Sequence, residues 1–311
     1  MAAVLSLPRR RVRTRCRTRL TVLAFLAPWL VGVAVFFAYP LAATFYFSFT
    51  DYTMLDRAHF VGLRNYVYLF AEDPYVWQAI RNTGWFLVVM VPAQVLFALG
   101  TALLLTRIKR GAGFFRTLFY LPSLAPPVAA TVAFVFLFNP ATGPVNRFLS
   151  WLGIEGPLWF SDPGWSKPAL VLLALWGSGN VMVILLAALL DVPRELHEAA
   201  AIDGASAPQI FRNVTLPSIA PVLLFAVVTG MIQALQYFTQ AVVAGTVAAG
   251  SADITGSAQV PGYPDGSTLT FPYWLYAQGF QRFNMGYACA LAVLLFVVSL
   301  GFTALMLRRA R

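Results

Sequence analysis

The sequence predicts an all-α integral membrane protein with six transmembrane helices and both termini in the cytoplasm. Three observations support this fold class. Of the 311 residues, 59% are hydrophobic and only 11% are charged, and the mean hydropathy is +0.71; a soluble domain has about 25% charged residues. Charged residues are absent from six long stretches. The basic residues are distributed unevenly over the segments that join those stretches.

Each uncharged stretch is long enough to cross a bilayer, because about 20 apolar helical residues span a hydrocarbon core roughly 30 Å thick. The stretches hold 174 of the 311 residues and cover 20–50, 82–106, 117–146, 168–190, 213–252 and 283–307. Residues 244–251, in the longest stretch, are small and polar and favour a loop, so this stretch receives one span. We therefore place the spans at about 21–47, 82–106, 117–138, 168–190, 217–243 and 284–307.

The basic residues predict the orientation. Lys and Arg number 22, and Asp and Glu number 12. With a cytoplasmic N-terminus, 16 of the 22 basic residues fall in the cytoplasmic segments, which are 1–19, 107–116, 191–212 and 308–311. This bias satisfies the positive-inside rule. The Arg-rich arm 1–19 is accordingly interpreted as a topology anchor, rather than as a nucleic-acid-binding arm or part of a cleaved signal peptide. Residues 308–311 form a short cytoplasmic tail.

Several kinds of chemistry are missing from the sequence. A phosphate-binding Walker A loop requires Gly-Lys-Ser/Thr, but the only two lysines, Lys109 and Lys167, are followed by Arg110 and Pro168. The two histidines are too far apart in the sequence for an HExxH zinc site. The predicted spans contain no carboxylate or histidine, which disfavours a proton relay. We expect no catalytic residue, metal or cofactor in this chain, and we predict that it is not an enzyme.

The connection 191–217 carries the strongest local signals. Asp191 is suited to cap a short helix that has Pro193 in its first turn, and Gly204 to end that helix. Ser206 and Gln209 have the spacing of a capping box, which predicts a second short helix. Pro217 is expected to bend the chain into the fifth span. The loop should therefore be a rigid helix–turn–helix on the cytoplasmic face.

Two segments of the chain carry a family resemblance. In the loop, Glu198-Ala199-Ala200, Gly204, Val214 and Leu216-Pro217 have the spacing of the EAA motif. The loop thus resembles that of bacterial ATP-binding-cassette (ABC) importer permeases. Phe60-Val61-Gly62-Leu63-Arg64-Asn65-Tyr66 is similar to a segment of the carbohydrate-uptake branch, the maltose and glycerol-phosphate permeases. Residues 245–265 depart from that branch, because they form a longer Gly/Ser/Ala/Pro-rich stretch.

The resemblance implies the type I ABC importer fold for a permease domain at 20–307. It places the chain in the bacterial cytoplasmic (inner) membrane as a multi-pass subunit, surrounded by lipid and binding no nucleic acid. The implied partners are a different second permease subunit (a heterodimer), two cytoplasmic ATPase subunits that hold ATP and Mg²⁺, and an extracytoplasmic solute-binding protein.

The same resemblance implies that loop 191–217 couples the permease to the ATPase. Glu198 would contact a basic ATPase residue, Ala199 and Ala200 would allow close approach, and Gly204 would set the turn. Leu216 and Pro217 complete the coupling motif.

Uncharged polar and aromatic side chains are candidates for a sugar path, since sugars present hydroxyls and apolar ring faces. On one predicted helix, Gln233, Gln236 and Gln240 are spaced to share a face, with Tyr237 beside them. The fourth span offers Trp176, Ser178 and Asn180. Hydrogen bonding between helices is the alternative role for these residues.

Three other functions remain as alternatives. A stand-alone secondary carrier would leave the EAA loop unexplained, and it commonly shows internal repeats, broken helices and an intramembrane ionisable residue. A membrane-embedded enzyme would need a metal or nucleophile constellation. An ABC permease for a solute other than a sugar would keep the same loop.

Overall fold

The computed structural model describes residues 13–108, 110–250 and 261–309. Over these residues the chain forms helices, joined by connections that contain one isolated antiparallel bridge between Thr50 and Phe60. The all-α prediction is confirmed. Residues 1–12 of the predicted arm and 310–311 of the predicted tail lie outside the described residues.

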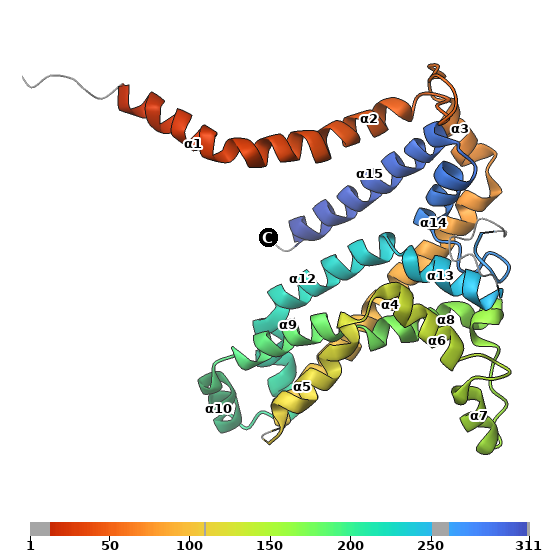
Figure 1. The fold of residues 1–311 in the computed structure, drawn as a ribbon. Coiled ribbons are helices and arrows are strands. Elements are labelled where there is room, and N and C mark those ends of the chain that lie inside the picture. The colour runs from red at the N-terminus through yellow and green to blue at the C-terminus, as the bar shows by residue number, and fades with distance from the viewer. Residues whose placement is uncertain (1–12, 109, 251–260, 310–311) are drawn as a thin grey trace, which may run out of the picture.

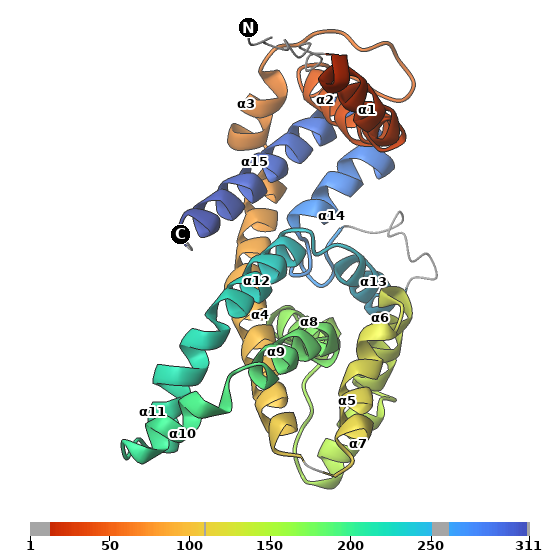
Figure 2. The same cartoon turned by 90° about the vertical axis from the view of Figure 1, so that its left-hand side faces the viewer.

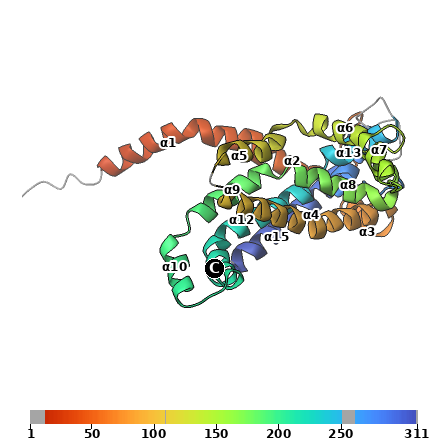
Figure 3. The ribbon, with the colours of Figure 1, turned by 90° about the horizontal axis from the view of Figure 1, so that it is seen from below.

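The long helices connect two ends of the molecule. One end holds α10 (Arg194–Ile202), the start of α1 (Arg13–Val33) and the end of α15 (Met285–Arg309), and we call it the α10 end. The opposite end, which we call the α7 end, holds α3 (Arg64–Ala71) and α7 (Pro144–Trp151) (Figures 1 and 3). In the predicted topology the α10 end is cytoplasmic.

The first span is a long helix at the edge of the molecule. It consists of α1, a five-residue π-helical stretch (Ala34–Ala38) and α2 (Tyr39–Phe47), and residues Ala24–Phe47 are apolar enough to cross a membrane. Figure 3 shows α1 extending away from the other helices. At α2, the ring of Phe45 packs edge-on against Phe296 of α15.

The second span is the centre of the fold. α4 (Pro74–Arg107) has 34 residues, so it is about 51 Å long and begins eight residues before the predicted span. It packs against α8, α9 and α12. Buried side chains of α4 belong to all three hydrophobic clusters of the described chain, one toward the α7 end, one central and one toward the α10 end.

The third span is not the continuous helix predicted over 117–138. It consists of α5 (Ala112–Tyr120), a 3₁₀ turn (Leu121–Leu124) and α6 (Pro127–Leu137), with a bend of 99°. Pro122, Pro126 and Pro127 explain the break, because proline lacks the N–H that continues a helix and restricts the residue before it. After α6 the chain forms α7 and another 3₁₀ turn (Trp159–Ser161).

The fourth span is also bent. α8 (Pro163–Trp176) and α9 (Gly179–Leu190) meet at 49°, where the sequence predicted one span over 168–190. Gly177 and Ser178 form the junction, and the Ser178 hydroxyl donates to the Leu175 carbonyl at 2.7 Å.

The fifth span begins earlier and ends earlier than predicted. α11 (Ala207–Ile210), a π-helical stretch (Phe211–Thr215) and α12 (Leu216–Leu235) form one 29-residue helix. Pro217 therefore does not bend the chain: it lies inside this continuous helix, two residues after the π-helical stretch.

The chain breaks again at 236–238, and α13 (Thr239–Ala248) follows. The prediction of a loop from residue 244 is thus wrong. The small residues there allow close packing: Ala244 is buried, and a Cβ added at Gly245 would lie 3.1 Å from the Tyr263 carbonyl oxygen.

The last part of the chain leads into the sixth span. α14 (Phe271–Tyr276) and a π-helical stretch (Ala277–Gln281) precede α15, which spans the membrane close to the predicted 284–307. Asn82 of α4 holds this region by donating to the carbonyls of Gly266 and Leu269 at 2.8 and 2.9 Å. Four helices of the described chain are long and apolar enough to cross a membrane, and the two bent pairs bring the number to six if each is one span.

Candidate functional site

The loop at the α10 end has the predicted helix–turn–helix form, except that its second helix, α11, is not a separate short helix and continues into α12. Gly204 ends α10 with φ +78°, and Ala205 N–H donates to the Ala200 carbonyl at 3.0 Å, a pairing that closes helices on a left-handed residue. Ser206 and Gln209 form the predicted capping box, in which Ser206 N–H donates to Gln209 Oε1 at 2.7 Å. Asp191 does not cap α10, since Pro193 occupies the N-cap position.

The loop is fixed to the spans at two points. Val192 is buried in the cluster at the α10 end with Leu105 and Ile219. The His197 ring bridges the helices, with Nδ1 3.3 Å from the Pro193 carbonyl oxygen and Nε2 3.1 Å from Thr215 Oγ1. A neutral ring with its proton on Nδ1 satisfies both contacts, by donating to the carbonyl and accepting from the threonine hydroxyl. In Figure 2, α10 and α11 lie side by side at the lower end of α12.

The outer face of α10 is exposed. Glu198 and Ala199 are exposed, and Ile202 is 86% exposed. Helical spacing puts Ala199 and Ile202 on the face opposite His197, with Glu198 at the flank of that face. Ala200 is half-buried, Leu216 is half-buried at the start of α12, and Pro217 beside it is exposed. The arrangement presents a carboxylate, a small residue and an apolar residue on a rigid helix, as a docking surface would.

Removing the histidine bridge is expected to loosen α10. In His197→Phe both ring contacts are lost, and each hydrogen bond contributes about 1 kcal/mol. Thr215→Val removes only one of them and serves as the matched variant. Limited proteolysis within 191–206 should become faster in the order wild type, Thr215→Val, His197→Phe. Equal cleavage rates in all three proteins would show that the bridge does not hold the loop.

The fourth-span candidates line two grooves beside the α8–α9 bend. Trp176, Ser178 and Gly179 line a groove of about 490 Å³ together with residues of α4, α5 and the 3₁₀ turn after α5. Asn180 lines a second groove of about 590 Å³ between α5 and α9. Ser123 Oγ, in the 3₁₀ turn after α5, lies 3.5 Å from Asn180 Oδ1 of α9. The Trp176 ring is partly exposed and offers an apolar face, and Asn180 offers an exposed amide.

The predicted glutamine stripe does not exist. Gln233 lies within α12, Gln236 caps its C-terminus and Gln240 lies in α13, so the break at 236–238 separates them. Gln233 and Gln236 are exposed, and Gln240 is half-buried.

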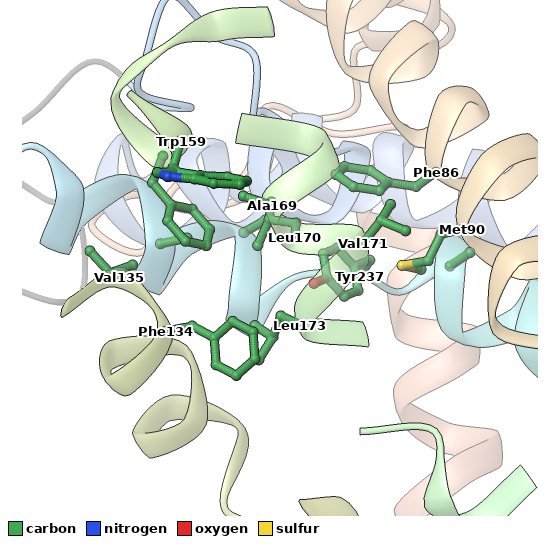
Figure 4. Close-up of a cluster of buried hydrophobic side chains, with 14 of the residues drawn as sticks. Phe86, Met90, Phe134, Val135, Trp159, Ala169, Leu170, Val171, Leu173 and Tyr237 are labelled. Carbon is green, nitrogen blue, oxygen red and sulfur yellow. The ribbon is translucent and has the colours of Figure 1, made fainter. Parts of the chain in front are cut away.

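Tyr237 does not line a path in this conformation. It is buried in the central cluster, with its ring 5.1 Å from that of Phe86, and Figure 4 shows it among the apolar side chains of that cluster. Its hydroxyl has no hydrogen-bond partner within the described chain.

Gly179 permits the close approach of α9 to α5. A Cβ added there would lie 2.6 Å from the Phe119 carbonyl oxygen and 2.9 Å from Tyr120 Cα, and both are backbone atoms that cannot rotate away. Gly177 is a matched neighbour, because its nearest atom would be 3.6 Å away and its φ is −83°.

Gly179→Ala is expected to destabilise the protein by about 1 to 3 kcal/mol through overpacking, whereas Gly177→Ala should be close to neutral. Thermal unfolding of the purified transporter measures both variants. Indistinguishable unfolding temperatures for the two alanine variants would contradict the close packing of α9 on α5.

A buried carboxylate that the sequence pattern left unnoticed joins three elements at the α7 end. Asp73 is 3% exposed. Its Oδ1 accepts from Tyr75 N–H at the start of α4, and its Oδ2 accepts from Trp274 Nε1 at 2.8 Å and the Tyr287 hydroxyl at 2.6 Å. The Asp73-Pro74 pair is an N-cap signal that predicts the helix start. Its partners Trp274 and Tyr287 lie 201 and 214 residues away in the sequence, so no local pattern predicts these two contacts.

Comparison with known proteins is consistent with this geometry. Residues 94–310 match the family described as binding-protein-dependent transport system inner membrane component. The chain is 33% identical to the lactose transport system permease protein LacF of Rhizobium radiobacter, with 92% of this chain and 93% of the relative aligned. It is 32% identical to the sulfoquinovosyl glycerol transport system permease protein SmoG of Agrobacterium fabrum, with 94% and 91% aligned.

A solved structure has the same fold. A subunit of a bacterial ABC transporter involved in the import of the acidic polysaccharide alginate superimposes with a TM-score of 0.76 at 22% sequence identity, covering 97% of this chain and all of that one. The alginate transporter has also been crystallised in complex with a periplasmic protein bound to an alginate pentasaccharide, and this second match has a TM-score of 0.75.

Proposed function

The chain belongs to the family of binding-protein-dependent transport system inner membrane components, and we propose that it imports a carbohydrate, driven by a separate ATPase that docks on α10. As a family member, it is a multi-pass transport permease of the inner membrane. The observation that carries the coupling proposal is the rigid loop whose exposed face combines Glu198, Ala199 and Ile202. A stand-alone secondary carrier or an enzyme would have no need for such a docking face.

A carbohydrate is the solute class best supported. Relatives that align over more than nine-tenths of the chain are permeases for lactose and for sulfoquinovosyl glycerol. The groove beside the α8–α9 bend offers the indole of Trp176 for an apolar sugar face, and Asn180 nearby offers an amide for hydroxyls. The residues that line the groove at Trp176 are uncharged, which suits an uncharged sugar, and Arg116 lines the second groove beside Asn180.

The proposed complex contains a second permease, two cytoplasmic ATPase subunits that bind ATP and Mg²⁺, and a solute-binding protein at the α7 end. The two grooves beside α5 and α9 are open to the surroundings of the chain. A second permease packed against these helices would close the path. Closure of the ATPase pair would move the α10 loops. Because α11 and α12 form one continuous helix, this displacement would pass directly into the fifth span. Movement of that span would then open the path to one side of the membrane and close it to the other.

Site-directed photo-crosslinking tests the docking face. A photoreactive residue at position 202 is expected to cross-link to the ATPase subunit in membranes that contain the whole transporter, because Ile202 projects from the outer face of α10. The same group at Phe60, which is 74% exposed near the α7 end, is the control and should give no ATPase adduct. Absence of an ATPase adduct at position 202 would exclude docking on this face.

The solute class is tested separately, with the cognate solute-binding protein. Isothermal titration against mono- and oligosaccharides, polyols and glycerol phosphate should give binding to a saccharide only. Selective binding of a different solute would support the remaining alternative, an ABC permease for a non-sugar solute, and leave the coupling proposal intact.

A further inference from the structure

The outer loop between α6 and the fourth span carries a short helix whose role transport leaves unexplained. We propose that α7 (Pro144–Trp151) is an interfacial anchor that lies in the headgroup region of the outer leaflet, with the side chains of Phe148 and Trp151 inserted among the lipids. The proposal depends on the chain being a membrane protein and not on which solute it carries.

The loop has a built structure. Asn146 holds its two sides together: Oδ1 accepts from Trp159 Nε1 at 2.6 Å, and Nδ2 donates to the Pro157 carbonyl at 3.1 Å. Val145 and Leu149, one helical turn apart, pack against the central cluster. The inward face of α7 is therefore occupied by this chain, and the remaining face is held in a fixed direction.

The remaining face of α7 is divided into an apolar and a polar half. Trp151 is 81% exposed and Phe148 is 58% exposed, and Leu152 continues the same side just after the helix. At 100° per residue, Arg147 and Ser150, both exposed, share the flank next to Trp151, with Arg147 one helical turn before it. A helix that is packed on one side and divided in this way on the other matches a boundary between lipid and water.

The position of α7 supports lipid as the occupant. Figures 1 and 3 place α7 at the end of the molecule opposite α10, and in Figure 1 its axis crosses the direction of α4. α6, which precedes it, ends with exposed Phe136 and Leu137, so apolar surface continues from a membrane segment into the loop. Tryptophan is enriched at the level of the headgroups, where its ring is partly in apolar and partly in polar surroundings.

Spin-label accessibility in lipid nanodiscs tests the proposal on the complete transporter. In a Cys16→Ser, Cys289→Ser background, single cysteines at positions 148, 151 and 150 are nitroxide-labelled, and collision rates with oxygen and with a water-soluble nickel complex are compared. Labels at 148 and 151 are expected to favour oxygen over nickel several-fold. The label at Ser150, on the same helix, is the control and should favour nickel.

Two results would overturn the anchor. Nickel accessibility at 148 and 151 equal to that at 150 would put α7 in water. Low accessibility to both reagents at 148 and 151 would mean that a protein, either the second permease or the solute-binding protein, covers this face. The labelled positions are exposed in this chain, so the cysteine variants should fold. Unchanged thermal unfolding would verify that they do.

Discussion

Glu198→Gln is expected to reduce solute-stimulated ATP hydrolysis at least tenfold in the assembled transporter. The carboxylate is exposed on the free face of α10, so its loss does not disturb the fold of this chain. A hydrogen bond to a charged partner contributes about 1.5 to 3 kcal/mol. If that contact forms while the ATPase closes, its loss corresponds to roughly a 10- to 100-fold decrease in coupled turnover.

A matched variant separates coupling from a general effect of charge. Asp191→Asn makes the same change at an exposed carboxylate that precedes α10, and it should retain solute-stimulated hydrolysis. Gly204→Val should resemble Glu198→Gln, because the φ of +78° at this turn is strained for a β-branched residue. Equal stimulation in wild type, Glu198→Gln and Gly204→Val would remove the loop from the coupling mechanism.

Asp73→Ala is expected to have the largest effect on stability, lowering the free energy of unfolding by roughly 3 kcal/mol or more. The substitution leaves Trp274 N–H and the Tyr287 hydroxyl buried without their acceptor, and each unsatisfied donor costs about 1 to 3 kcal/mol. It also removes the N-cap of α4, which is worth about 1 kcal/mol. Because Asp73 joins α4 to α14 and α15 through these hydrogen bonds, its loss should loosen all three helices at the α7 end together.

The neighbouring carboxylate provides the control for Asp73. Glu72 is exposed and precedes Asp73 directly, so Glu72→Ala changes the same charge without removing a buried acceptor. Thermal unfolding of both variants in detergent, with hydrogen exchange of α14 and α15 as a local probe, measures the difference. Similar unfolding temperatures and unchanged exchange in Asp73→Ala would show that the network contributes little.

The parts of the fold that depend on local chemistry could be predicted from the sequence. Uncharged stretches fix where helices cross the membrane, and Gly204 and the Ser206–Gln209 capping box define the loop by short-range hydrogen bonds. The bends could have been anticipated in part, since Pro126-Pro127 and Gly177-Ser178 are breaking signals. The apolar composition of the stretches does not reveal the bends, because a straight span and a bent span have the same composition.

The substrate path could not be predicted in the same way. The glutamine stripe assumed an unbroken helix, and the break at 236–238 has neither proline nor glycine to mark it. Burial of Tyr237 and the contacts of Gly179 and Asp73 arise between segments far apart in the chain, so no local pattern specifies them.

Solute uptake by reconstituted vesicles tests the central proposal, a permease without its own energy source, most directly. Vesicles containing this chain, its second permease and the ATPase subunits should accumulate the solute delivered by the solute-binding protein only when ATP is supplied on the α10 side. Vesicles with this chain alone should not accumulate it under a proton or sodium gradient. Gradient-driven uptake by the chain alone, with no response to ATP in the full complex, would contradict the account.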